Sequence, residues 1–172
     1  MKLLKVLCFL FCAQLSYTQS LDSKDRLSES VFYFIRHAEK DRSNPENKNP
    51  ELNQQGKIRA LNWLYFFREI PLEKIYSTNY NRTIQTVKQI AEEKNITISY
   101  YSPEKIDVEN FKKQNKSMSI LVVGHSNTTP ELVNLIIGEK KFEKMDDNDN
   151  SSMFVIRELA GEITVEHIIT KY

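Results

Sequence analysis

The stretch VFYFIRHAEK, residues 31–40, decides how this chain folds. Its first five residues are β-branched or aromatic without a polar break, which is typical of a strand buried on both faces of a parallel sheet. The run then ends abruptly in an arginine, a histidine and further charged residues. A buried strand that ends in reactive side chains indicates an α/β domain with a site at the carboxyl end of its sheet.

Strand and helix patterns alternate along the rest of the chain. Asn53 is placed to cap a helix that runs to about Arg68, with Pro71 beyond its end. We expect further strands over 74–77, 96–101 and 119–123, helices over 83–91, 103–114 and 130–137, and a closing hairpin over 153–157 and 163–169. This order predicts a three-layer α/β sandwich with a mostly parallel central sheet and an antiparallel edge.

Composition is that of one ordinary domain. The chain has 172 residues, of which 40% are hydrophobic and 27% charged, enough for one core. A mean hydropathy of -0.50 excludes a polytopic membrane protein. The net charge of +1 gives no indication of a nucleic-acid groove or a polybasic membrane patch. The partner must therefore be inferred from a site, and the sequence leaves the oligomeric state open.

Residues 1–18 follow the order of a secretory signal peptide. A basic start precedes a short apolar run, and small residues precede the expected cleavage after Thr18. The run is too short to span a bilayer, so no stable membrane anchor is expected. Cleavage would remove Cys8 and Cys12, and with them any disulfide or thiolate nucleophile. We expect residues 19–172 to form a single exported domain, periplasmic or secreted.

Two histidines stand directly after apolar strands, at His37 and His125. The carboxyl ends of parallel strands share one edge, and Arg36 and Arg82 are expected at the same edge. Arginine offers a planar donor fork that matches phosphate oxygens, and a helix start after His125 adds backbone N–H groups. Phosphate is thus the expected ligand. Neutral imidazole is also a nucleophile, so phosphoryl transfer through a phosphohistidine is possible, with the second histidine stabilising the transferred group.

Other ligands remain as alternatives. His37 and Glu39 could share one face of an extended segment and hold a metal, but the chain has no His-Glu-x-x-His or His-x-His motif. The run of Asp and Asn over 146–150 suggests calcium, yet it lacks the Gly and Glu of an EF-hand loop, which favours a solvated loop. His167 lacks polar context and is interpreted as a structural hydrogen-bonding residue.

Four separated motifs resemble the histidine phosphatase superfamily, the phosphoglycerate-mutase-like family. They are RHAE at 36–39, LNQQG at 52–56, YSTNYNRTIQT at 76–86 and GHSNT at 124–128. The motifs come in the family's order and span most of the chain. The resemblance implies a phosphoglycerate-mutase-like fold and an enzyme that needs no metal and no organic cofactor.

The resemblance also implies residue roles. His37 would be the nucleophile, Arg36, Arg82 and His125 would surround the transferred phosphoryl group, and Asn127 would touch phosphate. The small exported members that remove phosphate from lipopolysaccharide core heptose look similar in size, signal peptide and the RHAE spelling. A phosphomonoesterase acting on a small or envelope-linked sugar phosphate is therefore expected. The alternative is a phosphate- or phosphosugar-binding module without turnover.

The general acid stays open at this point. Ser126 stands where the acid-phosphatase branch of the family carries an aspartate. The candidates that remain are Glu39, Glu104, Asp107 and Glu109, or none of them. Glu39 is favoured, and also expected to contact substrate, because it alone lies next to the nucleophile in the sequence.

Overall fold

Six strands form one mixed sheet in the order β3-β2-β4-β1-β5-β6. The computed structural model describes residues 29–170, so the expected signal peptide lies outside the described residues. The strands are β1 (Ser30–Arg36), β2 (Lys74–Ser77), β3 (Ile98–Tyr100), β4 (Ser119–Gly124), β5 (Ser152–Leu159) and β6 (Glu162–Ile169). The first four strands in this order are parallel to one another. At the other edge β5 pairs antiparallel with β1, and β6 pairs antiparallel with β5. The predicted mixed sheet is confirmed.

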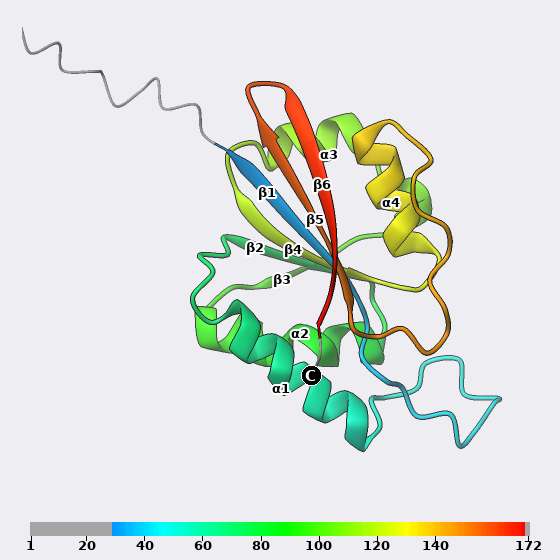
Figure 1. The fold of residues 1–172 in the computed structure, drawn as a ribbon. Helices are drawn as coiled ribbons and strands as arrows, with labels where there is room; N and C mark the ends of the chain where they lie inside the picture. The colour runs from blue at the N-terminus through cyan, green and yellow to red at the C-terminus, as the bar shows by residue number, and fades with distance from the viewer. Residues whose placement is uncertain (1–28, 171–172) are drawn as a thin grey trace, which may run out of the picture.

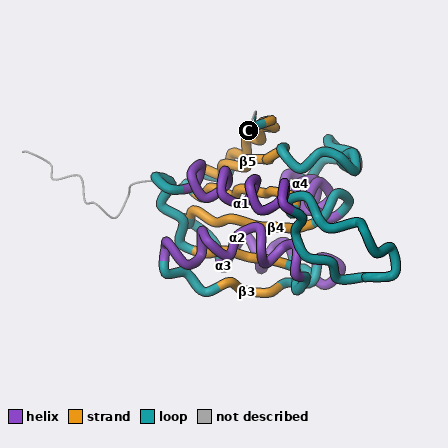
Figure 2. The backbone as a smooth tube through the Cα atoms, turned by 90° about the horizontal axis from the view of Figure 1, so that it is seen from below, coloured by secondary structure: helices purple, strands orange, loops and turns teal. Residues whose placement is uncertain are grey.

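Helices cover both faces of this sheet (Figure 1). They are α1 (Gln54–Phe67), α2 (Asn81–Lys94), the short 3-10 helix η1 (Pro103–Lys105), α3 (Val108–Gln114) and α4 (Thr128–Ile137). α1 and α2 pack on one face and α3 and α4 on the other. Figure 2 looks from the side of α1 and α2, which lie in front of the strands. The three predicted layers are therefore present.

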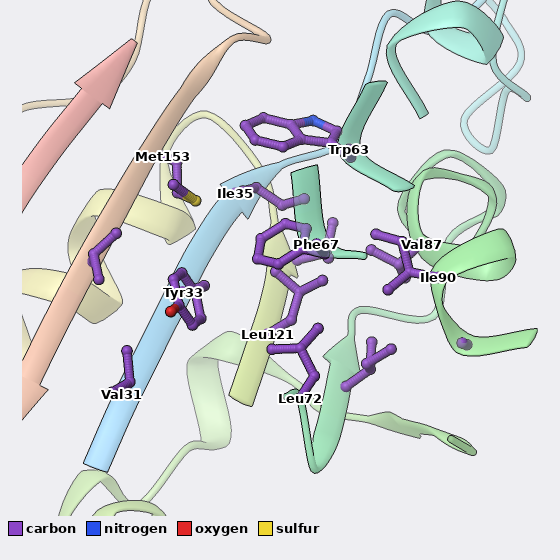
Figure 3. Packing of buried hydrophobic residues seen from close by; sticks show 14 residues of the cluster. Val31, Tyr33, Ile35, Trp63, Phe67, Leu72, Val87, Ile90, Leu121 and Met153 are labelled. Carbon is purple, nitrogen blue, oxygen red and sulfur yellow. The ribbon is translucent and has the colours of Figure 1, made fainter. Parts of the chain in front are cut away.

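β1 is held by apolar side chains on both faces. Tyr33 and Ile35 belong to the cluster that contains Trp63 and Phe67 of α1 (Figure 3), and the Tyr33 and Phe67 rings meet edge-on with centroids 5.4 Å apart. Phe34 points to the opposite cluster, under α4, and is fully buried. A strand packed this closely on both faces has little freedom to shift, so its carboxyl end is a firm platform for side chains.

The first turn of α1 lies against the segment that follows β1. The Asn53 side chain accepts a hydrogen bond from Gly56 N at 2.8 Å, as the predicted cap requires. A Cβ atom at Gly56 would overlap the carbonyl oxygen of Glu39. The glycine in this motif thus permits a close approach between α1 and the residues after β1.

Several elements have other bounds than predicted: α2 and β5 extend beyond the predicted 83–91 and 153–157, and three further elements differ. The third strand covers only Ile98–Tyr100. The expected helix over 103–114 is broken into η1 and α3, because Ile106 is extended and Asp107 begins a new helix by accepting from Asn110 N at 3.1 Å. α4 starts two residues before Pro130, which the first turn tolerates because its N–H groups need no intrahelical partner. Within residues 29–170, no helix is long and apolar enough to cross a membrane.

Candidate active site

The carboxyl ends of β1, β2 and β4 bring the predicted site residues together. Arg36 ends β1 and His37 follows it, while His125 follows β4. His37 N donates to Gly124 O at 3.0 Å, which ties the two strand ends to each other. The rings of His37 and His125 meet edge-on with centroids 5.6 Å apart. The expected convergence of both histidines at one edge of the sheet is confirmed.

His37 is oriented and neutral. Its Nδ1 lies 2.7 Å from Ala38 O, and because a carbonyl oxygen can only accept, Nδ1 carries the proton and Nε2 carries the lone pair. Ala38 N in turn donates to Thr86 Oγ1 at 2.9 Å, which fixes this segment on α2. Burial lowers the pKa of His37 to about 3, and Arg36, Arg82 and His125 act in the same direction. An imidazole in this state is a nucleophile at neutral pH.

Two guanidinium groups at the site have unsatisfied donors. Arg36 is 2% exposed, and its Nη1 donates to Asp146 O at 2.7 Å and to Asp149 O at 3.0 Å, but its Nε has no partner among residues 29–170. Arg82 lies with Cζ 4.5 Å from the centroid of the Tyr80 ring, and its Nε and Nη1 are buried without a partner in the described part of the chain. Buried charged donors are costly unless an acceptor completes them, so the arrangement is suited to an anion.

His125 is held by a chain of hydroxyl groups. Its Nδ1 lies 3.4 Å from Arg82 Nη2, which can only donate, so Nε2 carries the proton and donates to Thr78 Oγ1 at 3.1 Å. Thr78 Oγ1 donates to Thr83 Oγ1, which donates to backbone carbonyls. Burial lowers the pKa of His125 to about 4, with Arg82, Arg36 and Lys40 adding to the effect. Nδ1 therefore faces the arginine side of the site.

The Asp and Asn run over 146–150 is part of the site's support, and its interpretation as a merely solvated loop was incomplete. Besides the two backbone contacts to Arg36, the side chain of Asp147 lies 3.5 Å from Arg36 Nη2. Asn150 is 5% exposed and donates from Nδ2 to His37 O at 2.8 Å. Composition alone could not indicate this, because the partners lie more than 100 residues away in the sequence.

A hollow of about 290 Å³ opens beside His37. It is lined by His37, Glu39, Lys40, Arg42, Asn53, Gln55, Asp147, Asn148 and Asn150. Both of its carboxylates are bound by arginines: Glu39 receives Arg59 Nε at 2.8 Å and Nη2 at 2.7 Å, and Asp147 contacts Arg36 and Arg42. A carboxylate that binds a guanidinium group through two hydrogen bonds accepts those hydrogen bonds. Glu39 thus lines the hollow beside His37, but its ion pair with Arg59 does not fit the expected role of proton donor.

The other acid candidates lie on η1 and α3. Asp107 caps α3, while Glu104 and Glu109 are exposed on these two elements. Asn127 is exposed at the start of α4 and lines a second hollow of about 580 Å³ along that helix. A contact of Asn127 with phosphate therefore stays a prediction. His167 Nε2 lies 2.8 Å from Ser152 Oγ, which agrees with its structural interpretation.

Three residues with contacts or charge at the site are not singled out by the sequence patterns. Thr78 and Tyr80 lie inside the YSTNYNRTIQT motif, and Lys40 directly follows RHAE. Their positions next to the motif residues are the only sequence signal that could have pointed to them. Among residues 29–170, no group of three His, Cys, Asp or Glu side chains is arranged to hold a metal ion.

Comparison with known proteins agrees with this geometry. Residues 32–102, from β1 to just beyond β3, match the profile of the histidine phosphatase superfamily (branch 1). The chain has the fold of that superfamily. Among curated protein sequences, none matches this chain significantly.

Several solved structures share this fold over most of the chain. A candidate phosphohistidine phosphatase, SixA from Agrobacterium tumefaciens, is 20% identical with a TM-score of 0.61, and the match covers 82% of this chain and 99% of that one. A candidate α-ribazole-5'-P phosphatase from Escherichia coli is 13% identical with a TM-score of 0.65, covering 83% and 97%. The protein histidine phosphatase SixA complexed with tungstate is 14% identical with a TM-score of 0.60, covering 81% and 96%. At these identities the likeness establishes the fold.

Proposed function

We propose that this protein is a phosphatase that transfers a phosphoryl group from a small phosphate ester to His37 and then to water. The observation that carries the proposal is a set of buried guanidinium nitrogens around a neutral imidazole, Arg36 Nε and Arg82 Nε and Nη1, which have no partner within residues 29–170. Phosphate oxygens are acceptors that match such a donor set. The profile match and the tungstate complex of SixA, whose bound anion resembles phosphate, also support the proposal.

The reaction divides into two displacements. The lone pair on His37 Nε2 attacks phosphorus, the bond from phosphorus to the leaving oxygen breaks, and that oxygen takes a proton from solvent. Water then attacks the phosphohistidine, releasing inorganic phosphate and restoring neutral His37. Arg36 and Arg82 balance charge on the equatorial oxygens, and His125 can donate from Nδ1 once the dianion has raised its proton affinity. The Nδ1–H of His37, bonded to Ala38 O, keeps Nε2 directed at phosphorus. No step calls for a metal ion.

A small or envelope-linked sugar phosphate is the substrate class we propose. It rests on the likeness of the RHAE motif and the signal-peptide pattern to the exported heptose phosphatases, and the polar lining of the hollow beside His37 is compatible with hydroxyl groups. A phosphoramidate such as phosphohistidine is a second candidate. It is favoured because both carboxylates of that hollow are bound by arginines, and the imidazole of phosphohistidine leaves as a neutral group once its other ring nitrogen has taken a proton from solvent, without an acid from the protein.

Export is the location we propose for residues 19–172. The support is the order of basic, apolar and small residues over 1–18. Intact-mass measurement of the protein from the periplasm or medium of an expressing bacterium is expected to give a chain that begins near Gln19. A mass that retains residues 1–16 would contradict export by this route.

Trapping the intermediate tests the proposed chemistry. Quenching turnover of a ³²P-labelled substrate is expected to leave label on the protein that is lost in acid and kept in base, and His37→Ala is expected to carry none. Vanadate should inhibit and EDTA should not. Acid-stable label, or activity abolished by EDTA and restored by zinc, would overturn the mechanism. Tight phosphate binding with no label and no turnover would instead support the binding-module alternative.

A further inference from the structure

Lys40 holds a fixed place beside the nucleophile. Its backbone forms an isolated antiparallel bridge with Leu52, and its carbonyl accepts from Asn53 Nδ2 at 3.4 Å. On the preceding residue, Glu39 O accepts a hydrogen bond from Asn53 N at 2.9 Å. The contacts with Leu52 and Asn53 therefore fix the backbone of residues 39–40. The Lys40 side chain lines the hollow of about 290 Å³ together with His37. It is therefore positioned to meet whatever part of a substrate enters that hollow.

The charge of Lys40 is not balanced within the described part of the chain. None of the ion pairs found within residues 29–170 includes its ammonium group. Burial, followed by repulsion from Arg82 and Arg42, lowers its pKa, and only Asp147 acts in the opposite direction. Lys40 also contributes to lowering the pKa of His125, so its field reaches the phosphoryl site. An acidic group that enters the hollow would offset this repulsion and favour the charged form of Lys40.

The transferred phosphoryl group has donors other than Lys40. The unpartnered nitrogens of Arg36 and Arg82 serve a phosphate dianion. The acidic side chains of the 146–150 loop act on Arg36, and Asp147 also pairs with Arg42. Within residues 29–170 the Lys40 ammonium group takes part in no ion pair, so it is left to meet an acidic group that enters the hollow.

We propose that Lys40 binds a second acidic group, a carboxylate or a phosphate, carried by the part of the substrate beyond the transferred phosphoryl group. This inference rests on the proposed function and narrows its substrate class to phosphate compounds that carry a further acidic group. The ammonium donates to that group inside the hollow beside His37, where Asn148 and Gln55 supply further polar contacts. Arg42, which is half-exposed and paired with Asp147, adds attraction at the rim.

A matched pair of substrates tests the subsite. 6-Phosphogluconate and glucose 6-phosphate share the phosphorylated carbon and differ by a carboxylate, and glucose 1,6-bisphosphate supplies a second phosphate instead. The protein is expected to favour one of the two doubly acidic compounds by about 10-fold in kcat/KM over glucose 6-phosphate, the value of one charged hydrogen bond. Which compound is favoured tells whether the second group is a carboxylate or a phosphate. The preference should shrink as ionic strength rises.

In Lys40→Met, the kcat/KM of the favoured doubly acidic compound is expected to lie within about 2-fold of the kcat/KM of glucose 6-phosphate, because the charged hydrogen bond to the second acidic group is gone. Lys88→Met, on the exposed surface of α2, is the matched control and should keep the wild-type ratio. An equal kcat/KM for all three substrates in the wild type would overturn the proposal. So would a Lys40→Met variant that loses activity on all of them in one proportion, because Lys40 would then serve the transferred phosphoryl group.

Binding to the His37→Ala protein separates this inference from the proposed function, since it needs no turnover. Calorimetry is expected to show tighter binding of a doubly acidic compound than of glucose 6-phosphate, and loss of the difference in His37→Ala/Lys40→Met. If no substrate is turned over but this difference is found, the phosphatase proposal fails and the subsite stands. If turnover and acid-labile label are found without any difference, the subsite fails and the phosphatase proposal stands.

Discussion

The side-chain amide of Asn150 donates a hydrogen bond to the backbone carbonyl of His37, with 2.8 Å between Nδ2 and the oxygen. Both residues are buried, so water does not replace this bond when it is lost. The 146–150 loop also receives the guanidinium of Arg36 on two carbonyl oxygens. One loop, far along the chain, therefore holds both members of the Arg-His pair in place.

Asn150→Ala is expected to lower both stability and activity. The His37 carbonyl loses its amide donor, which costs about 1–3 kcal/mol for a buried polar group left unsatisfied. Urea unfolding and kcat measured on one substrate check this. Asn148→Ala, an exposed neighbour in the same loop, is the control for unfolding alone, because Asn148 also lines the hollow beside His37, and it should change stability by less than about 0.5 kcal/mol. Equal effects of the two substitutions on stability would contradict the role of Asn150.

Stability should fall in mild acid because His37 is buried in its neutral form. The unfolded chain takes up a proton near the ordinary pKa of 6.5, whereas the folded state does so only near 3. Protons thus favour unfolding between these values, and stability is complete only above about pH 6.5. Linkage gives a loss of about 2 kcal/mol from this group between pH 7 and pH 5.

Urea denaturation at pH 7 and pH 5 measures this loss, with His37→Gln as the comparison. The variant should lose less stability on acidification than the wild type. His125, with its pKa lowered to about 4, contributes a loss of the same sign in both proteins. An identical pH dependence for the two proteins would show that His37 is not held neutral by the fold.

Glu39→Gln and Arg59→Met should have matching effects. Each breaks the same ion pair, between groups that are 15% and 12% exposed, and so loosens the segment after β1 against α1. We expect both variants to lose activity on alkyl and aryl phosphates in the same proportion, because an aryl phosphate leaves without protonation. Steady-state rates on one substrate of each kind test this. If Glu39→Gln slows the alkyl ester about 10-fold more than the aryl ester and Arg59→Met does not, Glu39 is the general acid.

Thr78→Val should impair the second histidine without removing it. The substitution takes away the acceptor of the His125 Nε2 proton and leaves the ring free to change tautomer. We expect kcat to fall by about 10-fold, and Thr78→Ser to restore most of it, since loss of one hydrogen bond at a catalytic group has this size. The pH profile of kcat should shift in the valine variant and not in the serine variant. Unchanged profiles for both would limit Thr78 to a packing role.

Local patterns in the sequence determined the main features of this protein. The apolar runs ending in Arg36 and His37 and before His125 identify buried parallel strands, because strand burial depends on the composition of a few consecutive residues. Strand ends at one edge of a parallel sheet then bring both histidines together, and the structure confirms that they meet. The start of α1 at Asn53 was equally predictable, since a cap acts within one helical turn.

Only the tertiary structure decided the states and partners of those residues. The neutral form of His37 arises from burial and from the charges of Arg36 and Arg82 on two separate elements, and the support of the 146–150 loop joins residues more than 100 positions apart. In the same way, Arg59 pairs with Glu39, and Lys40 makes no ion pair with any of residues 29–170, because folding places their neighbours around them. Burial and electrostatic balance are sums over everything that surrounds a group in space, and no local run of sequence contains those terms.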